Sequence, residues 1–394
     1  MKTKLEAKFE GWRVRSKARW VEQGEKSSAY FHRLIAARRQ ATRISTLRSA
    51  TQGGLVTETD KLVKEAREFY AKLYEQGQTS EADQDFLLEQ VEKQLSGGQR
   101  EKMEEDISEE EVREAIQTAP NGSSPGSDGL PYEFYKTVRE ALVPFLTQLY
   151  NSMMEGGTTP PSMKQALISL IYKQKGEEED LKNWRPISLL NCDRKLFARI
   201  LVTRLQNQVG SVIHESQTGF VKRRLIQDNT MMVQQILDHH RTTGEDGAMV
   251  FLDQEKAYDK VDRRYLEKCL IKFGVGPRWR TGAECLLTGL SARVLVNGFQ
   301  SNTLEVQQGV PQGDPLSPVL YDLAVEPLLC YLRNKLKGLP LGGHPFQCSA
   351  FADDIAVGLA DEEDQRVLLK GLQLHEKACN AKLNLDKTNS CRCH

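Results

Sequence analysis

The chain has 394 residues, enough for one to three domains and a sizeable core. Lys+Arg and Asp+Glu both total 54, so the formal net charge is zero and no overall field indicates a nucleic-acid partner. The eight cysteines lack a disulfide-like spacing, and no apolar run approaches the roughly 20 residues that cross a bilayer. A disulfide-rich secreted protein and a membrane protein are therefore excluded, and we expect an intracellular chain.

The charge is nevertheless segregated along the chain. Residues 1–50 carry 13 Lys/Arg against 4 Glu, and residues 182–224 carry 9 bases against 2 acids. Between them, residues 75–114 carry 14 acids against 4 bases. Two basic blocks separated by an acidic one suit a polyanion bound along one face, although solvated helix faces are the commoner cause of any single charge run.

The N-terminal third is predicted to be mainly helical. In residues 1–50 aromatic side chains alternate with bases, which suits RNA stacking and equally suits an amphipathic helix packed on its own domain. Both interpretations remain open. We expect further helices at about residues 60–74, an exposed acidic helix with loose ends within 76–98, a helix opened by a capping box at Ser108 and Glu111, and a helix over 133–154.

A hairpin is predicted next. Gln165–Tyr172 has the apolar, β-branched pattern of a strand, and the extended segment Asn183–Leu189 follows a polar loop. Lys173 and Arg185 fall at corresponding places on the two arms. Such a pair suits a phosphate group held from two sides, whereas either residue alone would more often be simply solvated.

The second half of the chain alternates predicted strands and helices. A helix over 195–205 is followed by a basic loop at 217–224 and a helix from Asp228. The buried strand Met249–Asp253 then ends on an acid, and Asn-Gly at 297–298 marks another hairpin. The Gly/Pro-rich loop 307–318 leads into a helix over 319–332, and a last helix covers 362–378.

Asp353 and Asp354 are predicted to lie at the tip of a hairpin formed by residues 348–358, because short apolar runs flank the two acids. Asp is a common turn residue, and taken alone the pair fits a plain polar turn. Neighbouring carboxylates repel, however, and a bound cation makes their proximity favourable. With Asp253 ending a second strand, the three acids suit two Mg²⁺ ions ~4 Å apart, the arrangement for in-line phosphoryl displacement.

These segments resemble the reverse transcriptase domain of LINE-like non-LTR retrotransposons. The first metal motif of that family is similar to Phe251–Asp259, the template- and nucleotide-contacting loop to Gln312–Pro318, and the second metal motif to Phe351–Asp354. Further segments that resemble the family are Asp128–Pro131, Asn183–Leu189, Gln217–Phe220 and, in the N-terminal extension, Arg19-Trp20, Gly24–Lys26 and Tyr30-Phe31. The resemblance covers nearly the whole chain in the family's order.

The resemblance implies roles for individual residues. Asp253 and Asp353 would hold two Mg²⁺ ions, with Mn²⁺ as the alternative ion, and Asp354 would assist. Lys387 would donate a proton to pyrophosphate, and Tyr258 would exclude a ribose 2′-OH. The triphosphate would be bound by Lys173 and Arg185, the nucleotide pocket lined by Gln312 and Gly313, and nucleic acid contacted by Arg19, Trp20, Lys26, Lys222 and Arg224.

Several departures from the family pattern are visible. Pro311 stands where a basic or other residue is frequent, and Arg223 stands where many members have Gly before Arg224. No endonuclease domain precedes residue 1, and the chain ends forty residues after Asp354. We therefore expect the primer grip and the helical thumb to be absent, and little processive synthesis by this chain.

The resulting prediction is an α+β fold of the right-hand polymerase type. A mainly helical N-terminal extension would cover residues 1–118, fingers 119–248 and palm 249–394, with the reverse transcriptase domain at about 160–394. The function implied is RNA-directed DNA polymerisation from dNTPs on an RNA template and a DNA primer, in the cytoplasm and nucleus. We expect the element's own RNA among the templates. A truncated, non-catalytic RNA-binding remnant is the alternative. A two-metal nuclease is disfavoured because Tyr258, Lys173 and the 312–313 loop would then have no role.

Overall fold

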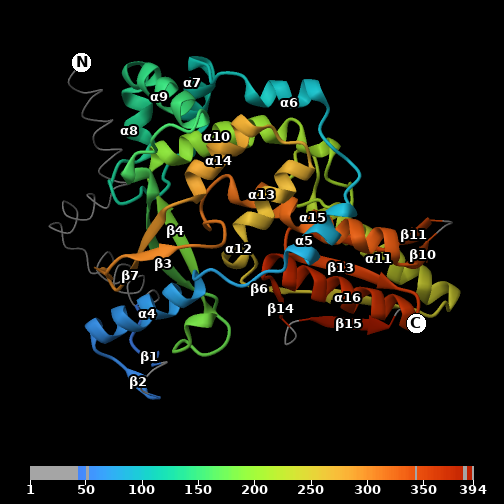
Figure 1. Ribbon diagram of the computed structural model, residues 1–394. Helices are drawn as coiled ribbons and strands as arrows, with labels where there is room; N and C mark the ends of the chain where they lie inside the picture. The colour runs from blue at the N-terminus through green and yellow to red at the C-terminus, as the bar shows by residue number, and fades with distance from the viewer. Residues whose placement is uncertain (1–42, 50–52, 342–343, 385–387, 393–394) are drawn as a thin grey trace, which may run out of the picture.

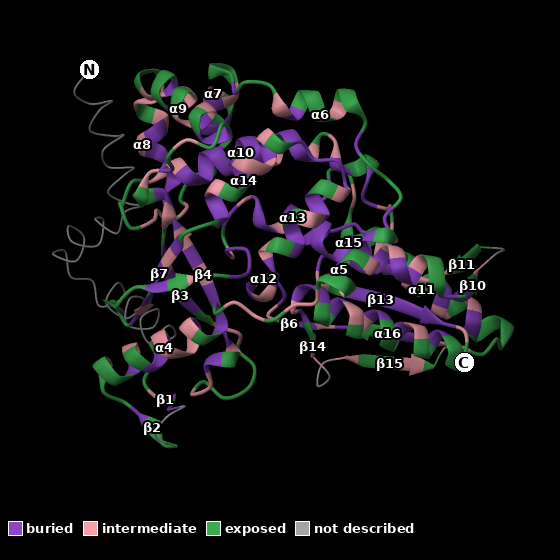
Figure 2. Ribbon diagram, viewed as in Figure 1, coloured by how far each residue is buried: buried purple, intermediate pink, exposed green. Residues whose placement is uncertain are grey.

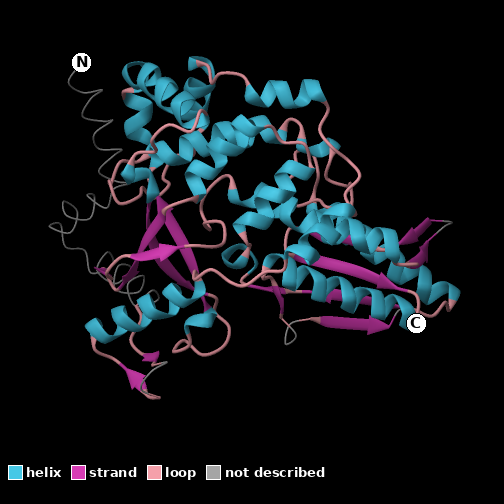
Figure 3. Ribbon diagram, viewed as in Figure 1, coloured by secondary structure: helices cyan, strands magenta, loops and turns pink. Residues whose placement is uncertain are grey.

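The computed structural model describes residues 43–49, 53–341, 344–384 and 388–392. Helices and sheets are mixed, as the α+β prediction requires (Figures 1 and 3). None of the helices in these ranges is both long and apolar enough to cross a membrane. The predicted N-terminal helix of residues 1–50 lies mostly outside the described residues. Where it is described it is wrong at Leu47–Arg48, which form strand β1 and pair with β2, Leu55–Val56.

The first part of the chain supplies helices to different regions of the molecule. Ser108 caps α7 with the predicted box, its hydroxyl accepting from the Glu111 amide while the Glu111 carboxylate accepts from the Ser108 amide. The predicted helix over 133–154 is interrupted at Val138. Helices α7, α8 and α9 pack together, whereas α4 packs on strand β7, Leu290–Val296, and α5 on α16, Glu362–Cys379. The bounds are α4 Thr59–Leu73, α5 Glu81–Glu89, α6 Gly97–Glu104, α7 Glu109–Thr118, α8 Tyr132–Thr137 and α9 Arg139–Met154.

The expectation of an exposed, loose acidic helix within 76–98 is wrong. Helix α5 packs against α16, Glu362–Cys379, with Leu87 and Leu88 buried. Gln84 is also buried, and its side-chain amide donates to the Ala378 carbonyl at 2.9 Å. The acidic side chains lie on the outer face, because the apolar spacing of this short helix provides one buried stripe.

One sheet is built from the predicted hairpin and a distant segment. Strands β3, Gln165–Tyr172, and β4, Trp184–Leu190, pair antiparallel, which confirms the hairpin. Strand β7, Leu290–Val296, adds to β3 in parallel and turns at Asn297-Gly298 into β8, Phe299–Gln300. This sheet also includes β9, Leu304–Val306, and carries the short helices η1 Pro161–Lys164 and η2 Leu181–Asn183 on its connections. Residues of the predicted fingers and palm therefore share one sheet.

The second sheet carries the predicted acids. Its order is β12, Cys348–Phe351; β13, Asp354–Leu359; β5, Ala248–Leu252; and β15, Asn389–Arg392, and all its pairs are antiparallel. Two short ladders flank it, β6, Gln254–Glu255, with β14, Lys382–Leu383, and β10, Leu339–Leu341, with β11, His344–Phe346. The helices in this part of the chain are α11 Ile226–Thr243, α12 Ala257–Lys260, α13 Arg263–Lys272, α14 Pro277–Leu287, α15 Ser317–Lys335 and α16.

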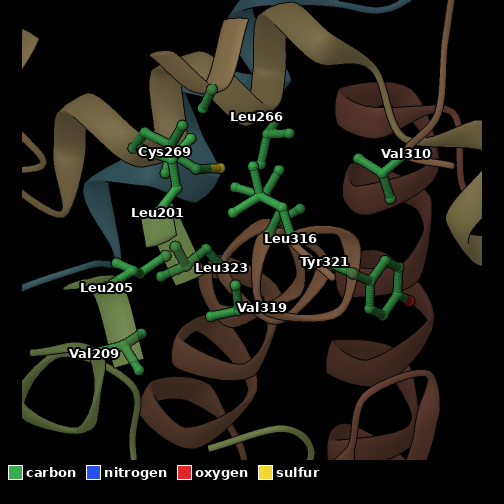
Figure 4. Close-up of a cluster of buried hydrophobic side chains, with 14 of the residues drawn as sticks. Leu201, Leu205, Val209, Leu266, Cys269, Val310, Leu316, Val319, Tyr321 and Leu323 are labelled. Carbon is green, nitrogen blue, oxygen red and sulfur yellow. The ribbon is translucent and has the colours of Figure 1, made fainter. Parts of the chain in front are cut away.

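Both faces of this sheet are covered (Figure 2). Ile355 and Val357 join a large core with α13, α15, α16 and α10, Cys192–Gln206, while Ala356 and Met249 pack against Ile236 of α11 on the other face. Figure 4 shows part of the large core, where Leu323 of α15 lies beside Leu201 and Leu205 of α10. The hairpin with the acids is thus set on a buried, two-sided sheet.

Candidate active site

The metal hairpin, as we call β12, β13 and their connection, turns in two residues. Phe351 pairs with Asp354, so Ala352 and Asp353 form the turn. Ala352 has φ 55°, in the left-handed region, and is buried. Asp353 is half-buried and Asp354 is exposed. The predicted hairpin tip is confirmed, and both carboxylates lie at one end of the sheet.

Asp253 lies at the same end of the sheet. Leu252 of β5 pairs with Ile355 of β13, and continuing this register by one residue sets Asp253 opposite Asp354. The main-chain carbonyl of Asp253 accepts a hydrogen bond from the Asn384 amide at 2.8 Å, which fixes the backbone where β5 ends. Neighbouring strands therefore end on acids, as the sequence predicts.

The donor chemistry of this strand edge fits Mg²⁺. Carboxylate oxygens are the hard ligands that Mg²⁺ prefers, and it takes one or two of them together with substrate phosphates rather than a full protein cage. Within the described ranges, no group of three or more His, Cys, Asp or Glu side chains lies close enough together to hold a metal ion.

Tyr258 is held beside the acids by a second aromatic ring. Its ring stacks on Tyr321 of α15, with centroids 4.7 Å apart and planes at 20°. The Tyr321 hydroxyl donates to the Gln254 side chain at 2.8 Å. Burial raises the pKa of Tyr258, and the neighbouring acids Asp322 and Asp353 raise it further. The ring is therefore neutral, supported from behind, and close to Asp353.

Asp322 is a buried acid that the sequence did not single out. Its side chain is fully buried, and neither carboxylate oxygen has a hydrogen-bond partner among the described residues. Burial raises its pKa well above the usual range, with Glu326 and Asp353 adding to the effect. Burial therefore disfavours the charged form of Asp322 at a point close to Asp353.

The segment Gln307–Leu316, called here the glycine loop, lies against β4. The Ser188 amide donates to the Gln312 carbonyl at 2.7 Å, and the Gln312 side chain donates to Asp259 at 3.0 Å. Gly313 has φ 114°, and a Cβ there would lie 2.7 Å from the Ser188 carbonyl oxygen. Glycine is therefore required where the loop approaches the strand.

Buried charges anchor the glycine loop. Arg194 of α10 and Asp314 form an ion pair at 2.8 Å, with both side chains almost fully buried. On the other side, the Arg263 guanidinium donates to the carbonyls of Val306, Gln308 and Gly309. Burial lowers the pKa of Arg263 to about 10, so it remains charged at neutral pH.

Lys173 and Arg185 project from one face of the hairpin but are not direct partners. Ile171 pairs with Arg185, and the Lys173 amide instead bonds to the Asn183 carbonyl, so the two bases are diagonal neighbours. Arg185 is exposed, and the Lys173 ammonium donates to the Lys182 carbonyl at 2.9 Å. Lys173 and Arg185 therefore lie on one face of the hairpin, but not directly opposite each other as predicted.

Lys256 adds a third base near this hairpin. Its ammonium lies 3.4 Å from the Trp184 carbonyl oxygen and 5.7 Å from the centre of the Phe69 ring. Burial lowers its pKa to about 8, and the charge of Lys173 acts in the same direction. Two lysines therefore approach each other at the loop end of the β3–β4 hairpin.

The basic loop at 217–224 contains side chains with different surroundings. Arg224 donates to four carbonyls, those of Gly210, Ile213, His214 and Gln217, so its guanidinium binds the chain's own loop. Lys222 is exposed and donates to the Asn207 side chain at 2.7 Å. Arg223 has φ 68°, which gives a physical reason why glycine suits this position. Of the other predicted residues, Arg19, Trp20, Lys26 and Lys387 lie outside the described residues.

Comparison with known proteins identifies the family. The family described as reverse transcriptase (RNA-dependent DNA polymerase) matches residues 171–393, more than half of the chain. The chain belongs to the reverse transcriptase family. Its predicted resemblance to non-LTR retrotransposon proteins is likewise confirmed.

Named relatives of this reverse transcriptase chain come from transposable elements. The "Transposon TX1 uncharacterized 149 kDa protein" of Xenopus laevis is 32% identical over 95% of this chain and 29% of its own length. A Pol polyprotein from the type-1 retrotransposable element R2 of Popillia japonica is 30% identical over 66% of this chain and 35% of its own length. The RNA-directed DNA polymerase from mobile element jockey of Drosophila melanogaster is 28% identical over 54% and 24%. The chain thus spans about a quarter to a third of these relatives.

Two residues at this reverse transcriptase site escaped the sequence analysis. Tyr321 and Asp322 lie within an apolar helical pattern, which predicts a core helix and nothing more. The available signal was their position, shortly after the Gly/Pro loop that resembles the family's nucleotide-contacting segment. A second signal was the acid itself: a carboxyl group on the buried face of a helix needs either a hydrogen-bond partner or a raised pKa.

Proposed function

We propose that the chain adds deoxynucleotides to the 3′-OH of a DNA primer, directed by an RNA template. The observation that carries this proposal is the convergence of Asp253 and the Asp353–Asp354 turn at one end of a buried antiparallel sheet. We further propose that this sheet belongs to the palm and the β3–β4 hairpin to the fingers of a right-hand polymerase. Membership of the reverse transcriptase family supports both statements.

In this proposal Asp253 and Asp353 hold two Mg²⁺ ions, with Mn²⁺ as the alternative, and Asp354 assists. The ions would activate the primer hydroxyl and neutralise charge on the phosphates. Burial disfavours a charge on Asp322, close to Asp353, and would so limit further repulsion at this point. Lys387 would supply the proton that the pyrophosphate leaving group takes.

The substrate side is proposed to be a deoxynucleoside triphosphate. The Tyr258 ring, backed by Tyr321, would contact the sugar and exclude a 2′-OH. Lys173 and Arg185 would bind the triphosphate from one face of the β3–β4 hairpin, and charge-assisted bonds of this kind are strong. Gln312 and Gly313 would line the nucleotide pocket, where the glycine loop meets β4.

The nucleic-acid partners are proposed to be an RNA template, including the element's own RNA, and a DNA primer. Lys222 is the exposed base on the described part of the contacting surface, whereas Arg224 contributes mainly by shaping the loop beside it. Arg19, Trp20 and Lys26 complete the set proposed from sequence. We place this activity in the cytoplasm and nucleus, in keeping with the absence of disulfides among the seven cysteines of the described residues.

Single-nucleotide addition tests the proposal without requiring processive synthesis. The chain is incubated with Mg²⁺, one dNTP and a DNA primer annealed to RNA, and Asp353→Asn is compared with Asp238→Asn, an exposed acid on α11. We expect Asp353→Asn to lose several kcal/mol of transition-state stabilisation, roughly a thousandfold in rate. Asp238→Asn should match the unmodified chain.

Two outcomes would contradict this account. Near-normal nucleotide addition by Asp353→Asn would contradict the proposal that the acids of the metal hairpin bind the catalytic ions. Tight, salt-sensitive binding of the RNA–DNA hybrid without any addition would instead favour the non-catalytic RNA-binding alternative.

A further inference from the structure

The loop before α11 adds to the edge of the metal hairpin. The Ala350 amide donates to the Ser216 carbonyl at 2.8 Å, and the Thr218 amide donates to the Ala350 carbonyl at 2.9 Å. Gln217 and Ala350 form an isolated parallel bridge, and the Asn229 side chain also donates to Ala350 at 2.8 Å. This basic-loop segment therefore covers the outer edge of β12, which would otherwise present unpaired backbone groups.

Gln217 reaches from this edge to the turn itself. Its side chain is fully buried, and its Oε1 accepts from the Ala352 amide at 3.0 Å and from the Gly219 amide at 2.8 Å. Both donors are main-chain amides, which identifies the accepting atom as the oxygen of the side-chain amide. One neutral side chain thus satisfies the buried amide of the residue immediately before Asp353.

The turn depends on this bond more than an ordinary turn would. Ala352 has φ 55°, a left-handed conformation that disfavours residues with a Cβ. A buried amide left without an acceptor loses its hydrogen bonds to water without replacement, which destabilises the turn. Without the Gln217 oxygen, the backbone would gain by leaving this conformation, and the direction of the next side chain, Asp353, would change with it.

Gly219 shows how closely the loop and the turn approach. A Cβ at Gly219 would lie 2.4 Å from the Ala352 amide nitrogen and 3.0 Å from Gln217 Oε1. The loop and the turn could not move apart to make room for a Cβ without breaking the hydrogen bond between the Ala352 amide and Gln217. The loop is therefore shaped to bring the Gln217 acceptor to the turn.

We propose that Gln217 is a positioning residue for the metal-binding acids: its side-chain oxygen fixes the turn so that Asp353 points toward the ions. The proposal rests on the proposed two-metal function. A neutral amide suits this place, because a carboxylate would provide the same acceptors but would add charge beside Asp353 and Asp354. A purely local role, in which Gln217 only shapes residues 214–220, is the alternative to be excluded.

Mn²⁺ binding measures the position of the acids independently of catalysis. Free Mn²⁺ is followed by electron paramagnetic resonance while the full chain is titrated, and exchange of the amides in residues 348–358 is followed by hydrogen–deuterium mass spectrometry. Gln217→Met keeps the volume and removes the oxygen that accepts both hydrogen bonds. We expect it to weaken Mn²⁺ binding about tenfold, the size typical of groups that orient metal ligands, and to speed exchange at the turn.

Matched variants separate positioning from general loosening. Asn229→Ala removes a contact to the same strand at Ala350 but leaves the turn bond, so Mn²⁺ affinity should not change. Gln217→Glu keeps an acceptor oxygen at this place. The turn amides should therefore exchange as slowly as in the unmodified chain, unlike those of Gln217→Met. Gly219→Ala keeps the Gln217 side chain but pushes the loop and the turn apart. It should therefore weaken Mn²⁺ binding as Gln217→Met does. This second variant decides the question if Gln217→Met folds poorly.

The outcomes distinguish this inference from the proposed function. If Asp353→Asn binds Mn²⁺ as well as the unmodified chain, the metal assignment itself fails. If binding depends on Asp353 but is unchanged in both Gln217→Met and Gly219→Ala, Gln217 shapes only its own loop and the inference is overturned.

Discussion

The metal hairpin and the glycine loop meet at one site but are anchored by different means. The glycine loop is held by buried charge, the Arg194–Asp314 pair and the Arg263 guanidinium. The turn of the metal hairpin is held by main-chain pairing and the neutral Gln217 amide, near Asp322, whose charged form is disfavoured by burial. Charged anchors can be strong where no ion binds, whereas next to the carboxylates that we propose as metal ligands a fixed charge would alter their interaction with the ions.

The largest predicted effect concerns the buried ion pair. Arg194→Met leaves Asp314 charged and uncompensated in a site from which water is excluded, so the free energy of unfolding should fall by about 3–5 kcal/mol. In Arg194→Met with Asp314→Asn, the Asn oxygen can still accept from the Leu316 amide. Urea denaturation followed by circular dichroism should show the double variant to be more stable than the single one. Equal loss in both would mean that packing of Arg194, not charge, anchors the loop.

A second prediction concerns pH and Asp259, which bonds to Gln312 and Tyr74. Burial raises the pKa of Asp259 to about 6, so the folded chain resists its ionisation while the unfolded chain ionises near pH 4. Stability should therefore fall as pH rises from about 4 to 6, by on the order of 2–3 kcal/mol, and then level off. Asp259→Asn should abolish this part of the pH profile, measured as the difference in denaturation midpoint between the two proteins. A difference that does not change with pH would contradict the shifted pKa.

Tyr258→Val tests the aromatic pair beside the metal hairpin. Removing the ring leaves room for a 2′-OH, so the ratio of kcat/KM for a ribonucleotide to that for the matching deoxyribonucleotide should rise roughly tenfold or more. Tyr258→Phe keeps the ring on Tyr321 and should leave the ratio unchanged. If the ratio does not move in Tyr258→Val, Tyr258 is only a core aromatic.

The smallest predicted effect is at Arg223, whose φ of 68° is unfavourable for a residue with a Cβ. Arg223→Gly should raise the free energy of unfolding by up to about 1 kcal/mol. Gln174→Gly, at another left-handed position with φ 56° outside the basic loop, provides a matched comparison. Thermal denaturation of the two variants would show whether the strain at Arg223 is relieved by glycine as at an ordinary turn. A less stable Arg223→Gly would indicate that the side chain itself holds the loop.

Local patterns predicted the parts of the site that local chemistry decides. The strand ending at Asp253, the hairpin tip at Asp353 and the Asn297-Gly298 turn follow from alternation, turn residues and apolar flanks, and all are found. The separation of acids and bases along the chain, by contrast, did not show that the acidic helix α5 would pack against α16.

Contacts between distant segments could not be predicted in the same way. The Arg194–Asp314 pair joins residues 120 positions apart, and the parallel pairing of β3 with β7 joins two hairpins that each look complete in sequence. Likewise, the bond from Gln217 to Ala352 depends on a loop lying along the edge of β12. Such contacts depend on how whole elements pack, which periodicity and turn chemistry do not specify.

The most direct test of the central claim is the number and affinity of Mn²⁺ ions bound by the chain with a DNA primer on RNA and a dNTP. We expect two ions per chain in the unmodified protein, and weaker binding in both Asp253→Asn and Asp353→Asn, while Asp238→Asn binds as before. Unchanged binding of two ions in both Asp253→Asn and Asp353→Asn would contradict the assignment of the metal site to these strand ends.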